Sequence, residues 1–214
     1  MIIHRVAQGS PEWHAVRAGC ITASNFKLAR SRLKTGPNKG DFTEAAKDYA
    51  FRLAIERISK QPLDEGFETW SMRRGQELEP AARMAHEIET GITVEEVGFV
   101  TTDDGLFGAS ADGFIGEDGG AEYKCFVSPE KLRSILLSGD TSDVIDQCDG
   151  GMWITGRRYW EFCLYCPALE TIGRELTIHR IERNDDRIET MEPELMQFAA
   201  LVAEFETKLR QKAA

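Results

Sequence analysis

The 214-residue sequence lacks any apolar run near the roughly 18 residues that a membrane-spanning helix needs. Its first residues, Met1 to Arg5, also lack the apolar region of a secretory signal peptide. These two absences predict a soluble, cytoplasmic protein. The length predicts one large domain that is able to bury a sizeable core.

Cysteine is sparse, and repeats and low-complexity segments are missing altogether. The five cysteines are scattered and odd in number, which is typical of a reducing compartment: Cys20, Cys125, Cys148, Cys163 and Cys166. Only the last two have a C-x-x-C spacing, with no second pair and no histidine at zinc spacing. This favours two half-buried strand cysteines over a zinc or redox site.

The sequence has fewer basic than acidic residues: 26 Lys and Arg against 36 Asp and Glu give a net charge of −10. Taken alone, that balance argues against a nucleic-acid partner. The distribution is uneven: residues 1–60 hold 11 basic and 5 acidic residues, net +6, which leaves −16 for residues 61–214. The asymmetry indicates either a polyanion-facing surface near the N-terminus or ordinary solvated helix faces.

The stretch from Gly108 to Cys125 predicts two short strands joined by a Gly/Asp turn. Asp112 lies on the first strand, whereas Glu122 and Lys124 lie two apart on the second and share one face. Two carboxylates and a lysine that converge in this way can hold a divalent metal and an activated water. The D-x9-E-x-K pattern alone favours an acidic hairpin with an exposed ion pair, so the case for chemistry depends on the rest of the chain.

The remaining pattern predicts a mixed α/β fold, with a mixed sheet flanked by helices. Helices are expected at residues 10–18, from 21–26 onward, and at 43–59, 69–90, 128–137, 140–156 and 185–212. Strands are expected at 92–100, in the hairpin, and at 159–166 and 176–181. Pro80 suggests that the 69–90 helix consists of two pieces or restarts there.

Two N-terminal features suit a phosphate ligand. The helix expected after Ile21 has Thr22 or Ser24 available as a cap, and its free N–H groups and dipole favour an anion. Arg17 lies just upstream and is able to form a bidentate pair with the same phosphate. Residues 30–40 form a basic loop with Gly and Pro, and we expect this loop to be mobile.

Four stretches together resemble one family. They are Trp13 to Ser24 (WHAVRAGCITAS), Gly75 to Pro80 (GQELEP), the hairpin from ASAD112G to E122YKC, and Gln147 with MWITG at 152–156. In order and spacing they resemble the phage lambda exonuclease family, the YqaJ-type viral recombinases of the PD-(D/E)xK nuclease superfamily, over residues 5–210. The resemblance implies a restriction-endonuclease-like core. It also implies a single nuclease domain over 1–214, with DNA-end-binding helices at 10–60, a catalytic core at about 70–183 and a C-terminal helical segment at 185–212.

The resemblance assigns roles to the hairpin residues. Asp112 and Glu122 are the expected metal-ligating carboxylates, and the backbone carbonyl of Tyr123 is a further ligand. Lys124 is expected to hold the attacking water. Glu79, on the preceding helix, is expected to be an additional acidic group near the metals, although an ordinary first-turn carboxylate is the alternative.

Other positions are carried over in the same way. Gln147 is expected beside the active site, or else simply packs. Arg17 and Ser24 match the residues that bind the 5′-phosphate of the DNA end, with a surface helix arginine as the alternative for Arg17. The basic loop from Arg30 to Lys39 falls where the family meets the duplex end.

The sequence departs from the family pattern at two positions. Ala111 replaces the proline that usually precedes the aspartate, and Phe126 stands where a proline is common after Lys-Cys. Proline ligates nothing, so neither change threatens the chemistry. The residues expected in the core are Trp13, Trp153, Tyr159 and Trp160. The histidines His14, His86 and His179 are expected to be structural.

The resemblance implies a Mg²⁺-dependent 5′-to-3′ exodeoxyribonuclease that acts on linear double-stranded DNA. It would release 5′-mononucleotides and leave 3′ single-stranded tails for recombination by annealing. It implies one or two Mg²⁺ per site with Mn²⁺ as a substitute, a ring-shaped homotrimer, a single-strand annealing protein as partner, and a phage or prophage gene expressed in a bacterial cytoplasm. A PD-(D/E)xK endonuclease and a catalytically inactive DNA-end-binding protein remain as alternatives.

Overall fold

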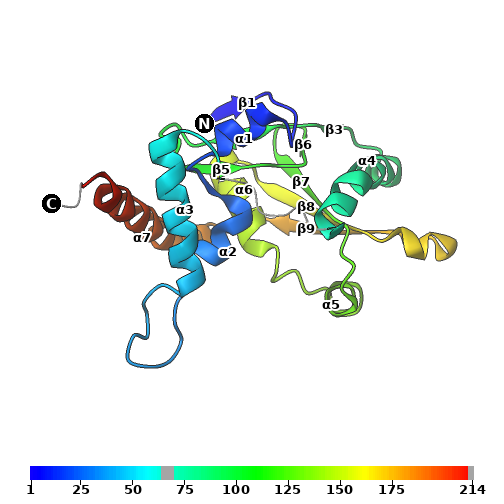
Figure 1. The fold of residues 1–214 in the computed structure, drawn as a ribbon. Coiled ribbons are helices and arrows are strands. Elements are labelled where there is room, and N and C mark those ends of the chain that lie inside the picture. The colour runs from blue at the N-terminus through cyan, green and yellow to red at the C-terminus, as the bar shows by residue number, and fades with distance from the viewer. Residues whose placement is uncertain (64–69, 212–214) are drawn as a thin grey trace. The chain divides into compact units, whose positions relative to one another are not determined.

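The computed structural model describes residues 1–63 and 70–211. The chain divides into two compact units, and Figure 1 follows its course from one terminus to the other. Unit 1 consists of Met1–Asp64, Gly98–Ser110 and Asn184–Ala214, and unit 2 consists of Glu65–Val97 and Ala111–Arg183. Each unit has its own sheet.

Unit 1 contains a four-stranded sheet in the order β1-β4-β5-β2. The strands are β1 (Ile2–His4), β2 (Ile21–Thr22), β4 (Phe99–Thr101) and β5 (Phe107–Ala109). The pairs β1–β4 and β4–β5 are antiparallel, and β2–β5 is parallel. The short strand β2 is buried, as are β4 and β5, so this sheet forms part of the core of unit 1.

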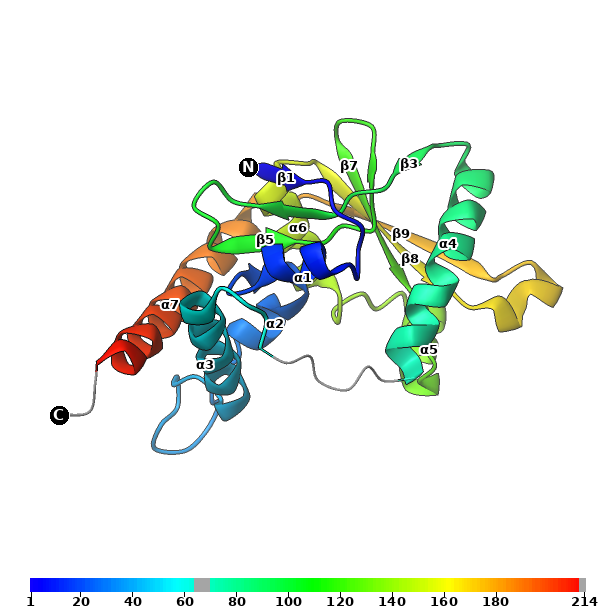
Figure 2. The same cartoon turned by 45° about the horizontal axis from the view of Figure 1, so that its top comes forward.

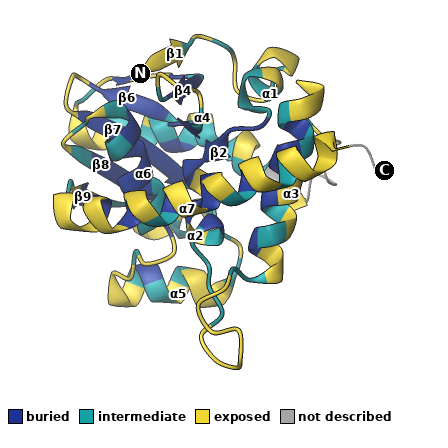
Figure 3. Ribbon diagram, turned by 90° about the vertical axis from the view of Figure 1, so that its left-hand side faces the viewer, coloured by how far each residue is buried: buried dark blue, intermediate teal, exposed yellow. Residues whose placement is uncertain are grey.

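The helices of unit 1 are α1 (Pro11–Arg17), the 3₁₀ turn η1 (Ala23–Asn25), α2 (Phe26–Ala29), α3 (Glu44–Ser59) and α7 (Asp185–Arg210). Helices α3 and α7 lie side by side (Figures 1 and 2). Phe198 of α7 is fully buried and stacks on Tyr49 of α3, with ring centroids 5.5 Å apart. Dark blue buried residues alternate with yellow exposed ones along α7 in Figure 3, as expected for an amphipathic helix.

Unit 2 contains a five-stranded mixed sheet in the order β3-β6-β7-β8-β9. Its strands are β3 (Val94–Glu95), β6 (Gly113–Ile115), β7 (Gly119–Lys124), β8 (Tyr159–Tyr165) and β9 (Leu176–Glu182). Only the β7–β8 pair is parallel, and the other three pairs are antiparallel. Its helices are α4 (Trp70–Thr90), α5 (Pro129–Ser138), α6 (Ile145–Thr155) and the 3₁₀ turn η2 (Pro167–Ile172).

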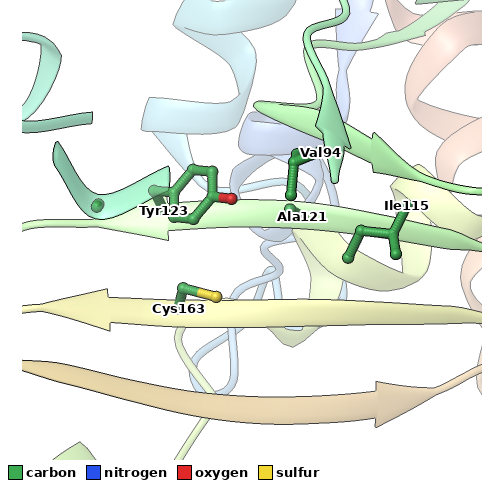
Figure 4. Close-up of a cluster of buried hydrophobic side chains, with 6 residues drawn as sticks. Val94, Ile115, Ala121, Tyr123 and Cys163 are labelled. Carbon is green, nitrogen blue, oxygen red and sulfur yellow. The ribbon is translucent and has the colours of Figure 1, made fainter. Parts of the chain in front are cut away.

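Helices cover both faces of the unit 2 sheet. On one face, Ala82 of α4 joins a buried cluster with Val94, Ile115, Ala121, Tyr123 and Cys163 (Figure 4). Trp160 points to the opposite face, because side chains alternate along β8. There a Cβ added to Gly151 of α6 would lie only 2.8 Å from the Trp160 ring, so the glycine lets α6 pack closely.

The predicted mixed α/β class is confirmed, and most predicted elements are present. The expected helices at 43–59 and 128–137 are α3 and α5, and the expected strands at 159–166 and 176–181 are β8 and β9. The segment 185–212 is one helix as far as Arg210. The expected boundaries at Thr69 and Lys212 lie outside the described residues.

The single strand predicted at 92–100 is wrong, because it is two strands in different sheets, β3 and β4. Gly98 lies between them. A Cβ at this position would come within 2.2 Å of the Val6 carbonyl oxygen and 2.6 Å of that of His4. The chain therefore passes against another backbone segment here, which only glycine permits.

The prediction that a helix begins within residues 21–26 is wrong for the first residues of that segment. Ile21 and Thr22 instead form β2, which pairs with Phe107 and Gly108, and only the four residues of α2 follow η1 as α-helix. Ile21 is fully buried, so tertiary pairing overrides the local helix signal. The strands β1 and β2 were not predicted, because two or three residues carry no periodic pattern.

Two helices, α4 and α6, differ from expectation. Helix α4 continues through Pro80 without a break, since buried Ala82 and His86 on the following turns offset the hydrogen bond that proline removes. Helix α6 begins at Ile145 and not at Asp140, whose side chain accepts a hydrogen bond from the backbone N–H of Ser142 in a turn. No helix within 1–63 and 70–211 combines the length and the apolar character that a bilayer crossing requires.

Candidate active site

The β6–β7 hairpin brings Asp112 beside Glu122. The antiparallel register pairs Gly113 with Ala121, so the next residue outward on each strand also faces its partner. The Asp112 backbone N–H continues this ladder by donating to the Ala121 carbonyl at 3.2 Å. The predicted hairpin is present as β6 and β7. The prediction that Asp112 lies on its first strand is wrong, because β6 begins at Gly113 and Gly108 belongs to β5 of the unit 1 sheet.

The Asp112 carboxylate is held by the backbone of β7. Its Oδ2 accepts a hydrogen bond of 2.6 Å from the Tyr123 backbone N–H. Burial raises the pKa of Asp112 well above its usual range, and the nearby Glu122 and Glu79 carboxylates raise it further. The site therefore concentrates negative charge in a place where water does little to disperse it.

Glu122 and Lys124 form an ion pair next to that carboxylate. The Lys124 Nζ donates to Oε1 of Glu122, whose side chain is only 3% exposed, against 30% for the lysine. Burial lowers the pKa of Lys124, but Glu122 and Asp112 outweigh this and hold the pKa above its usual value. The lysine is therefore an ammonium throughout the physiological pH range.

Glu79 reaches the same group of charges from α4. Its Oε1 accepts a 2.9 Å hydrogen bond from Nη2 of Arg83, one turn along the helix. Burial is the largest cause of its raised pKa, and Glu122 also contributes. Arg83 forms a second ion pair with Glu96, so it holds Glu79 without neutralising it completely.

Gln147 lies half-buried in the first turn of α6. The next residue, Cys148, is fully buried. Burial raises the pKa of the Cys148 thiol well above its usual value, and Glu122 raises it further. This turn of α6 is therefore close enough to the carboxylates for electrostatic interaction.

The donor set fits a hard divalent cation. Among the described residues, no three His, Cys, Asp or Glu side chains form a preformed metal cage. Mg²⁺ does not need one, because it is bound through one or two carboxylates and keeps several waters. Asp112 and Glu122 supply these carboxylates, and a cation between them would relieve the repulsion that raises the pKa of Asp112.

Arg17 and Ser24 belong to unit 1, whereas the carboxylates and Lys124 belong to unit 2. The Arg17 guanidinium lies 3.9 Å from the centroid of the Trp13 ring, and its Nη1 donates to Oγ of Ser110. Burial lowers the pKa of Arg17 to about 10, so it stays charged at neutral pH. The aromatic contact and the hydrogen bond fix its orientation.

Ser24 lies in η1, with its hydroxyl 3.2 Å from that of Thr22. Neither hydroxyl caps the following helix, and α2 has only four residues. The helix-terminus argument for a phosphate at this point is therefore not supported. Arg17, which is charged and held in place, remains the group in unit 1 that is suited to an anion.

Sequence reasoning missed two residues that hold the Arg17 segment. The buried Glu56 carboxylate accepts a 2.9 Å hydrogen bond from the Gly19 N–H, and Arg57 Nε donates to the Gly19 carbonyl at 2.8 Å. Together they hold both backbone polar groups of Gly19, two residues after Arg17. An acid on a helix gives no sequence signal for such a role.

The basic loop is anchored where it starts. Arg30 Nε forms a 2.5 Å ion pair with Glu194 of α7, and Arg32 donates to the Gln197 side chain of the same helix at 2.7 Å. Further along, Lys34 and Lys39 are exposed. The outer part of this loop is therefore the part that is available to a ligand.

The sequence and the fold both have relatives. The model of the YqaJ-like viral recombinase domain matches residues 12–158. An alkaline exonuclease from Laribacter hongkongensis is 31% identical, with a TM-score of 0.78 and coverage of 94% of this chain and 97% of that chain. The same exonuclease in complex with dAMP gives a TM-score of 0.80 at the same identity and coverage.

A phage-related exonuclease from Haemophilus somnus 129PT is 15% identical, with a TM-score of 0.62 and coverage of 89% of this chain and 94% of that chain. At that identity, the similarity extends to the fold alone. No curated protein matches the sequence. The resemblance that the four motifs indicated is confirmed by the match over residues 12–158.

The crowded carboxylates predict that Asp112→Asn stabilises the metal-free protein at pH 8. Because the pKa of Asp112 is raised on folding, its charge opposes folding above that pKa, and the cost vanishes below the usual value of 3.8. Asparagine still accepts the Tyr123 N–H but carries no charge. Thermal unfolding in EDTA should show a higher Tm for the variant at pH 8, with a difference that shrinks as the pH falls.

Glu117→Gln is the matched control, because it removes one negative charge from an exposed position in the same hairpin. Its Tm should follow that of the wild type. The method has the necessary resolution, since about 1 kcal/mol shifts the Tm of a domain of this size by about 2–4 °C. A Tm for Asp112→Asn equal to or below that of Glu117→Gln at pH 8 would contradict the electrostatic account.

Proposed function

Because the chain belongs to the YqaJ-like viral recombinase family, we propose that it is a Mg²⁺-dependent exodeoxyribonuclease acting on the ends of linear double-stranded DNA. It degrades one strand in the 5′-to-3′ direction, releases 5′-mononucleotides and leaves a 3′ single-stranded tail. The observation that carries the proposal is the convergence of Asp112, Glu122 and Lys124 on one hairpin. The 31% identical exonuclease from Laribacter supports the same reaction class.

Asp112, Glu122 and the backbone carbonyl of Tyr123 would hold the metal, one or two Mg²⁺ per site, with Mn²⁺ as a substitute. When bound, such a cation supplies Lewis-acid chemistry, lowering the pKa of a coordinated water and neutralising charge on the phosphate. Two carboxylates side by side, of which Asp112 has a pKa raised by burial and by the neighbouring Glu122, are a natural site for it. Glu79 adds a third acidic group at the same place.

Lys124 acts as a hydrogen-bond donor and not as a base. The two neighbouring carboxylates hold its pKa above the usual value, so it has no free lone pair at neutral pH. An ammonium in that state orients the attacking water and stabilises negative charge that develops on the phosphate. The Gln147 side chain, one residue before buried Cys148 on α6, is proposed to lie beside the active site.

Arg17 and Ser24 are proposed to bind the 5′-phosphate of the DNA end. Arg17 suits this role because it stays charged and is held against the Trp13 ring, which limits the entropy it loses on binding. An anchored 5′-phosphate fixes which bond is cut. Backbone contacts of this kind carry no base information, so sequence preference should be low.

A ring-shaped homotrimer that encircles the duplex is proposed as the working form. It would reconcile the net charge of −10 with a DNA substrate, because the outer surface can be acidic while the channel is basic. A single-strand annealing protein is the proposed partner for the 3′ tail. The gene is proposed to be of phage or prophage origin, with the protein acting in the bacterial cytoplasm.

The decisive test is digestion of a linear, 5′-phosphorylated duplex labelled at one end or the other, with Mg²⁺ or with EDTA. Mononucleotides should appear from the 5′ end only with the metal. Cleavage of closed circular DNA would instead identify an endonuclease. A folded protein that binds ends without cleaving them in Mg²⁺ would identify an end-binding protein and overturn the proposal.

Lys124→Ala is expected to reduce cleavage by at least about 100-fold, since removing one preorganised donor from a reacting oxyanion costs that much. Initial rates at saturating Mg²⁺ measure the effect. Lys47→Ala, which removes a lysine from an exposed ion pair with Glu44 on α3, should keep the wild-type rate. Comparable rates for both variants would remove Lys124 from the mechanism.

Arg17→Ala should abolish the preference for a phosphorylated end. The wild type is expected to cleave 5′-phosphorylated duplex faster than 5′-hydroxyl duplex, because one charge-assisted hydrogen bond is worth about 1.5–3 kcal/mol, or roughly 10- to 100-fold in rate. Paired digestions of the two substrates give the ratio. Arg210→Ala, at the exposed end of α7, should retain the preference, and retention by Arg17→Ala would disprove the role of Arg17.

A further inference from the structure

Tyr123 lies at the centre of the proposed metal site without facing it. It stands between Glu122 and Lys124 on β7, so its side chain projects to the opposite face of the sheet. Its backbone N–H nevertheless holds the Asp112 carboxylate at 2.6 Å. The position of the β7 backbone at residue 123 therefore affects all three candidate ligands: Asp112, Glu122 and the Tyr123 carbonyl.

The Tyr123 hydroxyl begins a buried chain of polar contacts. Its oxygen lies 2.9 Å from Nδ1 of His86, and Nε2 of His86 lies 2.8 Å from Oε2 of Glu161. His86 is fully buried, while Tyr123 and Glu161 are 6% and 9% exposed. With both ring nitrogens engaged, the imidazole is locked in orientation.

This chain is not the least costly way to fill the space. Tyr123 itself belongs to the apolar cluster that also contains Ala121 and Cys163 (Figure 4). Burying a hydroxyl, an imidazole and a carboxylate costs free energy that apolar side chains of similar size would avoid. Packing alone therefore does not account for these three polar residues.

These polar contacts connect two elements that carry site residues, α4 and β7, with the neighbouring strand β8. His86 is on α4, Tyr123 is on β7 and Glu161 is on β8, where it stands opposite Ala121 in the parallel register. Glu79 precedes His86 by seven residues, which is about two helical turns, so the two share one face of α4. Fixing His86 against β7 thus also fixes the height at which Glu79 meets the carboxylates.

We propose that the buried Tyr123–His86–Glu161 chain is a positioning device for the metal site. It holds the residue 123 peptide and the Glu79-bearing helix in register, so that the ligands are preorganised before a cation arrives. His86 and Glu161 are positioning residues, because they act through Tyr123 and α4. The inference rests on the proposed metal-dependent function and deepens it.

Such outer partners of metal ligands are typically worth about 10- to 100-fold in metal affinity. The test is Mn²⁺ binding to the 214-residue protein without DNA, measured by electron paramagnetic resonance or calorimetry. Tyr123→Phe keeps the buried ring and removes only the hydroxyl, and it should weaken Mn²⁺ binding by about 10-fold. A purely structural role would lower the Tm in EDTA but leave the Mn²⁺ affinity unchanged.

Tyr159→Phe is the matched control. Tyr159 packs against the same cluster from β8, and its ring lies under the Arg180 guanidinium at 3.5 Å. The variant makes the same chemical change on the same sheet, outside the chain of contacts to His86. Its Mn²⁺ affinity should equal that of the wild type.

His86→Leu supplies a second measurement. If Tyr123 and His86 act as one unit, the double variant with Tyr123→Phe should bind Mn²⁺ no more weakly than His86→Leu alone. Should His86→Leu fail to fold, Tyr123→Phe against Tyr159→Phe still decides. Equal Mn²⁺ affinity for those two overturns the positioning role.

The outcomes separate this inference from the proposed function. Wild-type Mn²⁺ binding that Asp112→Asn abolishes supports the metal site, whatever Tyr123→Phe does. A wild-type protein that binds no Mn²⁺ overturns both the metal-dependent function and the positioning role. Normal wild-type binding with an unaffected Tyr123→Phe variant overturns the positioning role alone.

Discussion

The repulsion between carboxylates near the end of β7 is the constraint around which unit 2 is built. Asp112 and Glu122 are forced together by the antiparallel register of a short hairpin, and Glu79 approaches them from α4. Their negative charge is partly compensated by hydrogen bonds from one lysine, one backbone N–H and one arginine. A site that concentrates charge in this way sacrifices stability, which is consistent with the cation-binding role proposed for it.

Strand β7 has different roles on its two faces. The face with Glu122 and Lys124 carries the charged candidates for catalysis, whereas the face with Tyr123 carries the polar chain to His86. Because side chains alternate along a strand, three consecutive residues suffice for both roles. The backbone between them connects the two faces, since the Tyr123 N–H binds Asp112.

In unit 1, Arg17 is likewise held by a small number of contacts. The Trp13 ring and the Ser110 hydroxyl hold the guanidinium. Glu56 and Arg57 of α3 hold the backbone N–H and carbonyl of Gly19. Both units therefore place a charged side chain next to backbone that is fixed by buried partners. Such second contacts determine geometry. Trp13 and Ser110 lie within the motifs that carry the family resemblance, whereas Glu56 and Arg57 belong to none of them.

The sequence alone determined the fold class, the long helices and the hairpin, because these depend on local periodicity, caps and turn residues. The sequence shows three helix caps, Ser10, Thr43 and Ser128, which the structure contains. The D-x9-E-x-K stretch could be recognised as a pair of strands. The family could also be recognised from the sequence, since four motifs in order are more specific than any one of them. Composition placed the excess of basic residues in the first 60 positions.

Only the tertiary structure decided the rest. The segment 92–100 became two strands in two sheets because Gly98 lies against a distant backbone, and Ile21 became a strand because it is buried beside Phe107. His86 was expected to be structural, and its place between Tyr123 and Glu161 depends on contacts 37 and 75 residues away along the chain. Local patterns carry no information about such distant partners, because only the folded chain brings those side chains together.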